Sequence, residues 1–195
     1  MKFYQSGDSS KPVIFLFPGT CCLYSSFYHV LDGLHSYFYT VTVSYDGFDP
    51  NEKTEFYSME DECEKIEQEI RKKYGGRIKA AYGCSLGGSF VSLLIQRKRI
   101  HIDHGIIGSS DMDEAGHLVA KIQSSMVVPF MYKMVHTGTL PKFMQKKLDK
   151  TDGGKKELYN GFLNMFGIGK GGSPWITKQS IYNQFYSDLV TKVQH

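Results

Sequence analysis

The sequence of 195 residues lacks long apolar runs and a strong excess of one charge. No stretch approaches the roughly 20 apolar residues that a bilayer-spanning helix needs, and the start, MKFYQSGDSS, lacks the features of a secretory signal. The 23 basic and 20 acidic side chains give a net charge of +3, too mild and dispersed to indicate nucleic-acid binding. These absences predict a cytoplasmic protein with no membrane or nucleic-acid partner.

Cysteine is also scarce. The four cysteines, Cys21, Cys22, Cys63 and Cys84, form neither two C-x-x-C pairs nor a Cys/His alternation with the spacing of a zinc site. Adjacent cysteines such as the first two could hardly form a disulfide with each other without strain. We therefore expect reduced thiols and no structural metal.

What the first 109 residues do contain is a regular alternation of strand and helix patterns. Short apolar or β-branched runs, typical of buried strands, recur along the chain. They cover residues 12–17, 37–45, 77–84 and 104–109. Between them lie apolar residues at helical spacing. Short connections of this kind require parallel strands with right-handed crossovers, so the pattern predicts an open α/β sheet covered by helices on both sides.

The helix predicted from about residue 59 has the clearest pattern. Met59, Cys63, Ile66 and Ile70 share one face. Three acidic residues occupy the early turns and three basic residues the last turn, which matches the helix dipole, and two glycines at 75 and 76 supply the stop.

The hydrophobic pattern of the sequence changes after residue 110. From there on the apolar residues recur at helical spacing, and no clear strand follows. We expect a core over residues 1–110 and a helical cap over residues 111–195. The cap is rich in Met and Phe, which suits either a pocket for an acyl or aromatic group or simple helix packing. Its basic stretch is interpreted as the solvated face of a helix and comprises Lys142, Lys146, Lys147, Lys150, Lys155 and Lys156.

A G-x-S-x-G pattern lies at the junction of a predicted strand and a predicted helix. It consists of Gly83, Cys84, Ser85, Leu86 and Gly87. Such a junction holds a serine hydroxyl out above the sheet, and glycines on both sides avoid collision with the tight turn and the helix. The alternative is an ordinary helix N-cap, which would not require glycine on both sides.

On these residues the chain resembles the α/β-hydrolase family. The segment VIFLFPGT at 13–20 stands where that family has a strand followed by its oxyanion loop. The resemblance implies that Ser85 is the nucleophile and that the backbone N–H groups of Thr20 and Leu86 are the oxyanion donors. It implies neither a metal nor an organic cofactor. Pro18 departs from the pattern, because it replaces the histidine usual before Gly19.

The remaining triad members are not evident. Asp111 or Asp113 fits the position of the acid in some such hydrolases, although capping of a helix is the simpler role. Six histidines are better explained as surface or core residues, and His195 lies at a chain end that is usually frayed. Either the chain is a C-terminally shortened hydrolase, which we prefer, or it has the fold without the activity. An exposed sheet edge then predicts a homodimer.

The function predicted from the sequence is hydrolysis of a small carboxylic ester or thioester through an acyl-serine intermediate. The shortened form is expected to be weakly active or inactive. Two other classes stay open, namely a non-catalytic protein that binds a small ligand and a nucleotide-binding α/β domain. A thiol nucleophile next to Ser85 is a further alternative.

Overall fold

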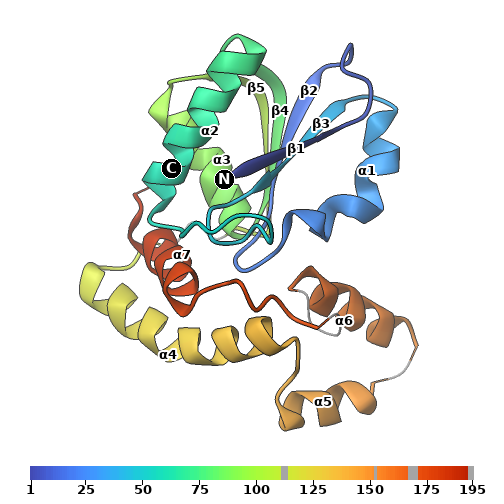
Figure 1. Ribbon diagram of the computed structural model, residues 1–195, viewed down its shortest axis with the longest axis vertical. Helices are drawn as coiled ribbons and strands as arrows, with labels where there is room; N and C mark the ends of the chain where they lie inside the picture. The colour runs from blue at the N-terminus through green and yellow to red at the C-terminus, as the bar shows by residue number, and fades with distance from the viewer. Residues whose placement is uncertain (111–113, 152, 167–170, 193–195) are drawn as a thin grey trace.

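The computed structural model describes residues 1–110, 114–151, 153–166 and 171–192, and its centre is a five-stranded sheet (Figure 1). The strands are β1 (Lys2–Ser6), β2 (Val13–Phe17), β3 (Tyr39–Ser44), β4 (Arg77–Cys84) and β5 (His101–Gly108). Their order is β1-β3-β2-β4-β5. Every pair is parallel except β1 with β3. The expected open and mostly parallel α/β sheet is confirmed.

The antiparallel strand β1 was not expected from the sequence. It pairs with β3 from Lys2 opposite Ser44 to Ser6 opposite Thr40. Four of its five residues are half-buried and Gln5 is exposed, with no clean alternation, because β1 is an edge strand. Phe3 packs edge-on against Phe15 of β2, with the ring centres 6.2 Å apart. Such a short edge strand is defined by its partner, and its own pattern is too weak to identify it.

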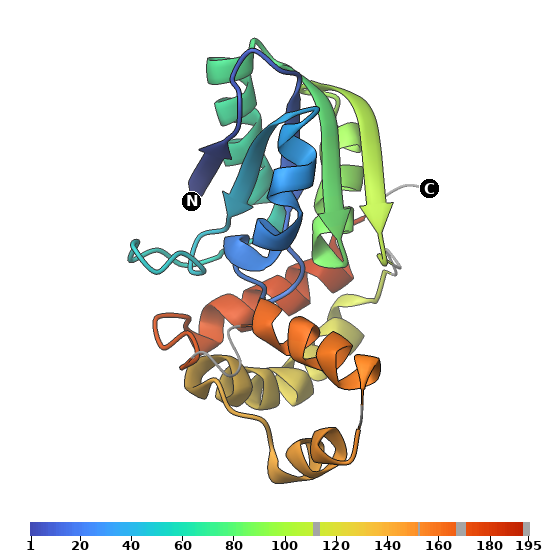
Figure 2. The same cartoon turned by 90° about the vertical axis from the view of Figure 1, so that its right-hand side faces the viewer.

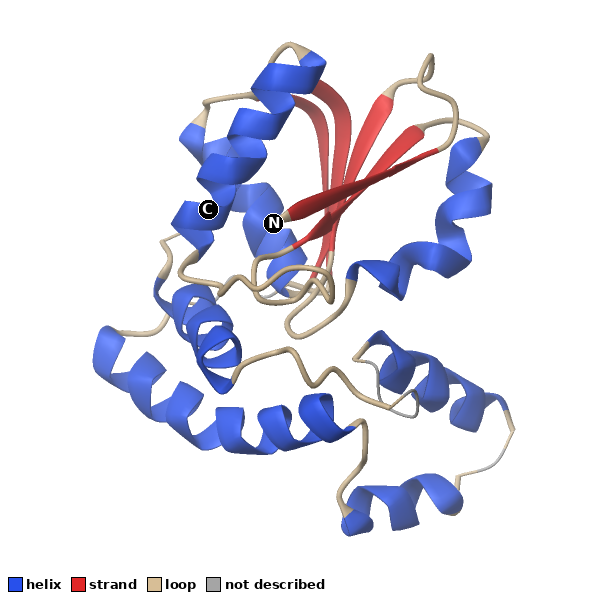
Figure 3. Cartoon of the chain, in the orientation of Figure 1, coloured by secondary structure: helices blue, strands red, loops and turns tan. Residues whose placement is uncertain are grey.

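Helices cover both faces of the sheet (Figures 1 and 3). The short 3-10 helix η1 (Tyr24–Phe27) and α1 (Tyr28–His35) lie on one face, while α2 (Met59–Tyr74) and α3 (Leu86–Arg97) lie on the other. The expected glycine stop of α2 is present, because Gly75 ends the helix with φ 63°. Its start is capped by Ser58, which accepts a hydrogen bond from the Asp61 N–H at 3.1 Å and was not singled out in the sequence.

Strand β2 shows why its sequence is apolar throughout. Phe15 and Phe17 belong to the large core on the α2 and α3 side, whereas Ile14 and Leu16 belong to a smaller core on the α1 side. Successive side chains of a strand point to opposite faces, so a strand covered on both faces needs apolar residues at every position.

The helical segment, residues 114–192, lies across the carboxyl ends of the parallel strands (Figures 1 and 2). It contains α4 (His117–Thr137), α5 (Lys142–Asp149), α6 (Gly154–Met165) and α7 (Lys178–Val190). Within its described residues there is no strand, as expected. Across the described chain, no helix is both long and apolar enough to pass through a membrane.

Helix α7 connects this segment to the sheet. It packs against α4 on one side, and on the other it reaches the loop between β3 and α2. There Asn183 Nδ2 donates to the Phe56 carbonyl at 2.7 Å, and Ser180 Oγ accepts from the Phe56 N–H at 3.2 Å. The loop after β3 is therefore held by a residue pair more than 100 positions away in the chain.

Strand β5 forms the other edge of the sheet, and its outer side pairs with no strand of the described residues. Ile106 and Ile107 on this strand are both exposed. An exposed apolar edge was expected, and the homodimer inferred from it stays a prediction.

Candidate functional site

Ser85 lies at a sharp turn between the end of β4 and the start of α3. Its backbone has φ 52° and ψ −123°, a conformation that residues other than glycine adopt only under strain of roughly 1–3 kcal/mol. The Ser85 N–H donates to the Gly108 carbonyl at 2.8 Å, and the Ser85 carbonyl accepts from the Gly88 N–H at 2.7 Å. These two bonds hold the turn, while the Ser85 side chain is exposed.

Glycines permit the close packing around this turn. A Cβ atom at Gly83 would overlap the carbonyl group of Gly87, and one at Gly87 would overlap the carbonyl group of Phe17. Neither obstacle is a flexible side chain, so the backbone itself would have to move. Gly88, which the sequence analysis did not single out, is similarly confined, because a Cβ there would lie 2.7 Å from Ser110 Cβ.

The loop after β2 lies directly against this turn. A Cβ placed on Gly19 would be 3.5 Å from Ser85 Cβ and 3.2 Å from the Cys84 carbonyl oxygen. The Thr20 N–H has no hydrogen-bond acceptor among the residues that the structure describes. Leu86 is the first residue of α3, so its N–H has no acceptor within the helix. Two unengaged backbone donors therefore lie in the segments that flank Ser85.

Comparison with known proteins identifies this architecture. No protein-family profile and no curated sequence matches the chain, but 394 chains of solved structures do. One is an α/β-hydrolase family protein from Desulfitobacterium hafniense, with a TM-score of 0.74 and 14% identity over 97% of this chain and 72% of that one. The chain has the α/β-hydrolase fold.

Two further α/β-hydrolase-fold structures are similar. A thermophilic esterase from Thermogutta terrifontis has a TM-score of 0.69 and 14% identity, over 96% of this chain and 66% of the esterase. A carboxylesterase study of Nitrososphaera gargenis provides another, with a TM-score of 0.67 and 13% identity, over 98% of this chain and 68% of that one. This chain thus spans about two thirds to three quarters of the length of these structures.

In this α/β-hydrolase fold, two buried side chains hold the loop that carries Pro18. The Tyr45 hydroxyl donates to the Pro18 carbonyl at 3.1 Å, and Gln184 Oε1 on α7 accepts from the Cys21 N–H at 2.9 Å. Burial raises the pKa of Tyr45 well above its usual value, so the phenol stays a donor. Gln184 is fully buried and comes from a region in which the sequence analysis found no site residue.

The four cysteines of the chain, including those near the turn at Ser85, are free thiols, as expected. Burial raises the pKa of Cys22 to about 12 and that of Cys21 well above its usual value. Both groups are therefore protonated near neutral pH and are poor nucleophiles.

No histidine within the described residues hydrogen-bonds to Ser85. His29 and His104 are exposed, and His35 lies within 2.9 Å of Ser6 Oγ on the sheet edge. His101 pairs with Asp103, and His117 lies 3.0 Å from the Tyr186 hydroxyl. His136 lies beside the ring of Tyr132 on α4. Asp111, Asp113 and His195 lie outside the described residues.

An apolar groove of about 360 Å³ runs along the α1 face of the α/β-hydrolase sheet. It reaches Cys84, the residue before Ser85, and Met165 of α6 lines its end in the helical segment. Among the described side chains of that segment, Met165 is the one that lines the groove, whereas Met126, Phe130 and Phe143 are exposed. A pocket was one of two alternatives for the Met and Phe residues of the segment. The groove observed is built mainly by the sheet and α1, with one methionine from the helical segment.

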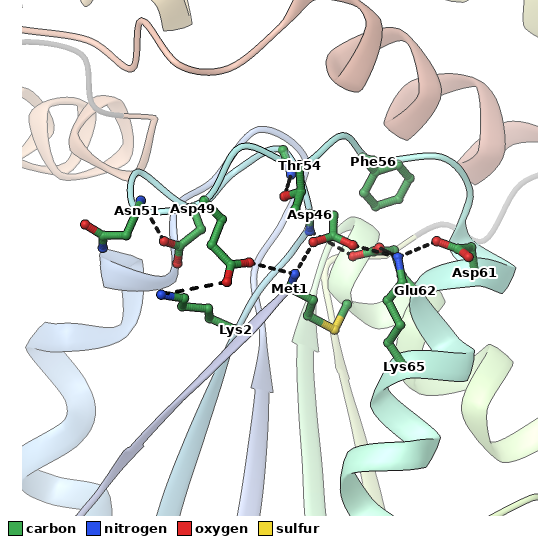
Figure 4. Close-up of polar contacts among 12 residues, drawn as sticks. Met1, Lys2, Asp46, Asp49, Asn51, Thr54, Phe56, Asp61, Glu62 and Lys65 are labelled. Atoms are coloured by element: carbon green, nitrogen blue, oxygen red, sulfur yellow. Dashed lines mark hydrogen bonds and ion pairs between the residues drawn. The ribbon is translucent and has the colours of Figure 1, made fainter.

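A buried charge cluster, not foreseen from the sequence, lies at the end of β3 (Figure 4). Lys65 Nζ on α2 contacts Asp46 at 2.6 Å and Glu62 at 3.1 Å, and the Met1 amino group also contacts Asp46. Glu62 additionally accepts from the Asp46 N–H at 3.0 Å. Asp46, Asp61 and Glu62 have the proximity of a metal site, but two ammonium groups, those of Met1 and Lys65, already form ion pairs with them.

The pKa values in this cluster are shifted in opposite directions. Burial, together with the neighbouring Asp46 carboxylate, raises the pKa of Glu62 to about 7. Burial acts against ionisation of Asp46 as well, but hydrogen bonds from Lys65 and the Met1 amino group keep its pKa below the usual value. One carboxylate of the pair thus stays charged while the other takes up a proton near neutral pH.

Replacement Ser85→Gly is expected to raise the free energy of unfolding by about 1 kcal/mol, because glycine adopts this backbone conformation without strain. Chemical denaturation measures the change. The control is Ser125→Gly in the interior of α4, which should lower stability by about 0.5 kcal/mol because glycine is the poorer helix former. A loss of stability at both positions would show that the turn at Ser85 is unstrained.

Replacement Glu62→Gln should change how stability depends on pH. The pKa of Glu62 is higher in the folded chain, about 7 against 4.5, so folding takes up a proton and stability falls as pH rises through this window. Glutamine has no such proton. Urea unfolding at a series of pH values should show the variant gaining ~3 kcal/mol relative to the parent between about pH 4 and pH 8. For Glu64→Gln, at an exposed position of the same helix, the free energy of unfolding plotted against pH should run parallel to that of the parent. Parallel plots for both variants would refute the raised pKa of Glu62.

Proposed function

We propose that the protein is a hydrolase that cleaves a carboxylic ester or thioester through an acyl-serine intermediate at Ser85. The observation that carries this proposal is an exposed serine hydroxyl on strained backbone, with the Gly19 loop packed against it. A plain helix cap would accept hydrogen bonds from the helix N–H groups, but the Ser85 side chain makes no such bond. Strain that presents an unused hydroxyl is typical of a catalytic nucleophile.

The proposed reaction uses these groups as follows. Ser85 Oγ attacks the substrate carbonyl carbon and loses its proton to a base, and the N–H groups of Thr20 and Leu86 stabilise the resulting oxyanion, at about 3 kcal/mol each. The C–O or C–S bond then breaks, and the leaving alcohol or thiol takes the proton. Water cleaves the acyl-serine by the same steps in reverse order. None of these steps calls for a cofactor.

The substrate class follows from the surroundings of Ser85. The groove that reaches Cys84 is lined mainly by aliphatic and aromatic side chains, which suits an apolar acyl group. The fold is shared with the esterase from Thermogutta terrifontis, which supports ester hydrolysis as the class of reaction. A small-molecule acyl ester or thioester is therefore the proposed substrate.

One observation favours a second function, the non-catalytic binding of a small ligand. Among the described residues no histidine and no carboxylate hydrogen-bonds to Ser85, so the group that would accept its proton is not in place there. A binding protein needs the groove and not the base. This alternative predicts ligand binding that is independent of the Ser85 hydroxyl.

Labelling with a fluorophosphonate probe tests the choice. Because the probe is far more reactive than an ester, we expect stoichiometric phosphonylation of Ser85 in the parent, seen as a mass increase of one adduct, and none in Ser85→Ala. Turnover of a p-nitrophenyl ester by the same chain should be slow, since no described base contacts the serine. The control Ser109→Ala leaves Ser85 intact and should label like the parent.

The result that would reject the enzyme is a folded parent protein that the probe does not label while a small apolar ligand still raises its melting temperature. Equal ligand-induced shifts in the parent and Ser85→Ala would then assign the groove to binding alone.

Gln184 should affect the proposed reaction through the loop it holds. In Gln184→Leu the buried Cys21 N–H loses its acceptor, so we expect the rate of probe labelling at Ser85 to fall about tenfold, with a stability loss of about 1–3 kcal/mol. Gln184→Glu keeps an acceptor oxygen and should restore part of the rate. The matched control is Asn183→Leu, which removes the hydrogen bond to Phe56 from the same helix and should lower stability without slowing labelling. Equal slowing in both leucine variants would contradict a specific role for Gln184.

A further inference from the structure

Helix α4 presents a stripe of large apolar side chains to solvent. Leu118, Ile122, Met126 and Phe130 follow one another at intervals of four and are 72%, 52%, 75% and 39% exposed. The opposite side of the helix is buried by Ala120, Ser124, Val128 and Val135. A row of large apolar side chains on a helix is normally covered, so this stripe is a surface without a partner in the described structure.

Helix α4, which carries the stripe, lies in the helical segment on the far side of α7 from the sheet. In Figures 1 and 2, α7 lies between α4 and the sheet, and α5 lies beyond α6 in the same outer region as α4. Phe143 on α5 is 68% exposed as well. None of these exposed apolar side chains lines the groove that reaches Cys84.

Lysine is the predominant charged residue on α4 and α5, where Asp149 is the one acidic side chain. Helix α4 contains no acidic residue, and lysines occur on it and on the neighbouring segment of α5. These exposed lysines, none of which forms an ion pair with a described residue, are Lys121, Lys133, Lys142, Lys146 and Lys150. Residues 114–195 contain eleven lysines and five acidic residues, whereas residues 1–113 contain twelve basic and fifteen acidic residues. Positive charge is concentrated in the helical segment.

The combination of an exposed apolar stripe with nearby lysines favours one class of partner over the others. A second copy of the chain would bring lysines against lysines, which is unfavourable. A nucleic acid would attract the lysines but would gain nothing from an aliphatic stripe. An anionic lipid surface suits both the apolar stripe and the lysines. Its acyl region accepts the apolar side chains, and its headgroups attract the surrounding lysines.

We propose that this face, Leu118, Ile122, Met126, Phe130 and Phe143 with the five lysines above, attaches the protein to an anionic lipid bilayer. Helix α4 lies in the plane of the interface, since its other side is packed against α7 and remains so. The attachment is peripheral and reversible. It does not depend on the proposed hydrolysis, because Ser85 takes no part in it.

Sedimentation of the full chain with vesicles tests this proposal. We expect binding to vesicles of phosphatidylcholine mixed with phosphatidylglycerol, much weaker binding to phosphatidylcholine alone, and a decrease as salt is raised. Ser85→Ala should bind like the parent, so that failure of the proposed function leaves this result unaffected.

Two pairs of substitutions separate the apolar and electrostatic contributions. Ile122→Ser with Met126→Ser should weaken binding to the anionic vesicles by roughly tenfold or more. Lys121→Glu with Lys133→Glu should weaken it by about fivefold per lysine and should reduce the salt dependence. The matched controls are Ile106→Ser on the edge strand β5 and Lys53→Glu in the loop before α2, which should both bind like the parent. Circular dichroism establishes that each variant is folded.

Three results would overturn the proposal. The first is no binding to anionic vesicles at low salt. The second is an equal loss from Ile106→Ser and from the α4 substitutions, which would indicate nonspecific adsorption of any exposed apolar residue. The third is a dimer of the parent, seen by light scattering, that dissociates in Met126→Ser and does not bind vesicles, which would assign the stripe to a second copy.

Discussion

The left-handed backbone of Ser85 is the constraint on which the site depends. Strand β4 becomes helix α3 within one residue only if the helix starts almost in contact with β4 and β2, and only glycine at 83 and 87 permits that approach. The same geometry places the amino end of α3, and therefore the positive end of its dipole, next to the serine. It also leaves room for the Gly19 loop to lie against the turn.

The helical segment is part of this arrangement and not an appendage to it. Gln184 on α7 holds the loop after β2, while Asn183 and Ser180 on the same helix hold the loop after β3. In the α/β-hydrolase family a histidine usually precedes the glycine of the first loop, and here Pro18 stands in its place. The Tyr45 hydroxyl and the Gln184 amide supply support for that loop from two other elements.

Charged groups serve two different purposes in the structure. At the end of β3 they are buried and paired, so that Asp46, Glu62 and Lys65 fix the position of one loop relative to α2. In the helical segment they are exposed lysines, and their effect is exerted outward on whatever approaches α4 and α5. Buried pairs contribute to specificity of structure, whereas unpaired surface charges determine which partners are attracted.

Much of the fold could be predicted from patterns within short stretches of the sequence. The glycine stop and the charges of α2 act between residues a few positions apart. The apolar run of β2 and the glycines around Ser85 meet long-range packing demands, but each demand leaves a recognisable pattern within a short stretch of sequence. Three other features could not be predicted from the sequence, because each joins residues far apart in the chain. They are the pairing of β1 with β3, the charge cluster around Lys65, and the contact of Cys21 with Gln184, which are 163 positions apart. Helical spacing also predicted that α4 is a helix, but only tertiary packing decided which of its apolar sides is covered and which faces solvent.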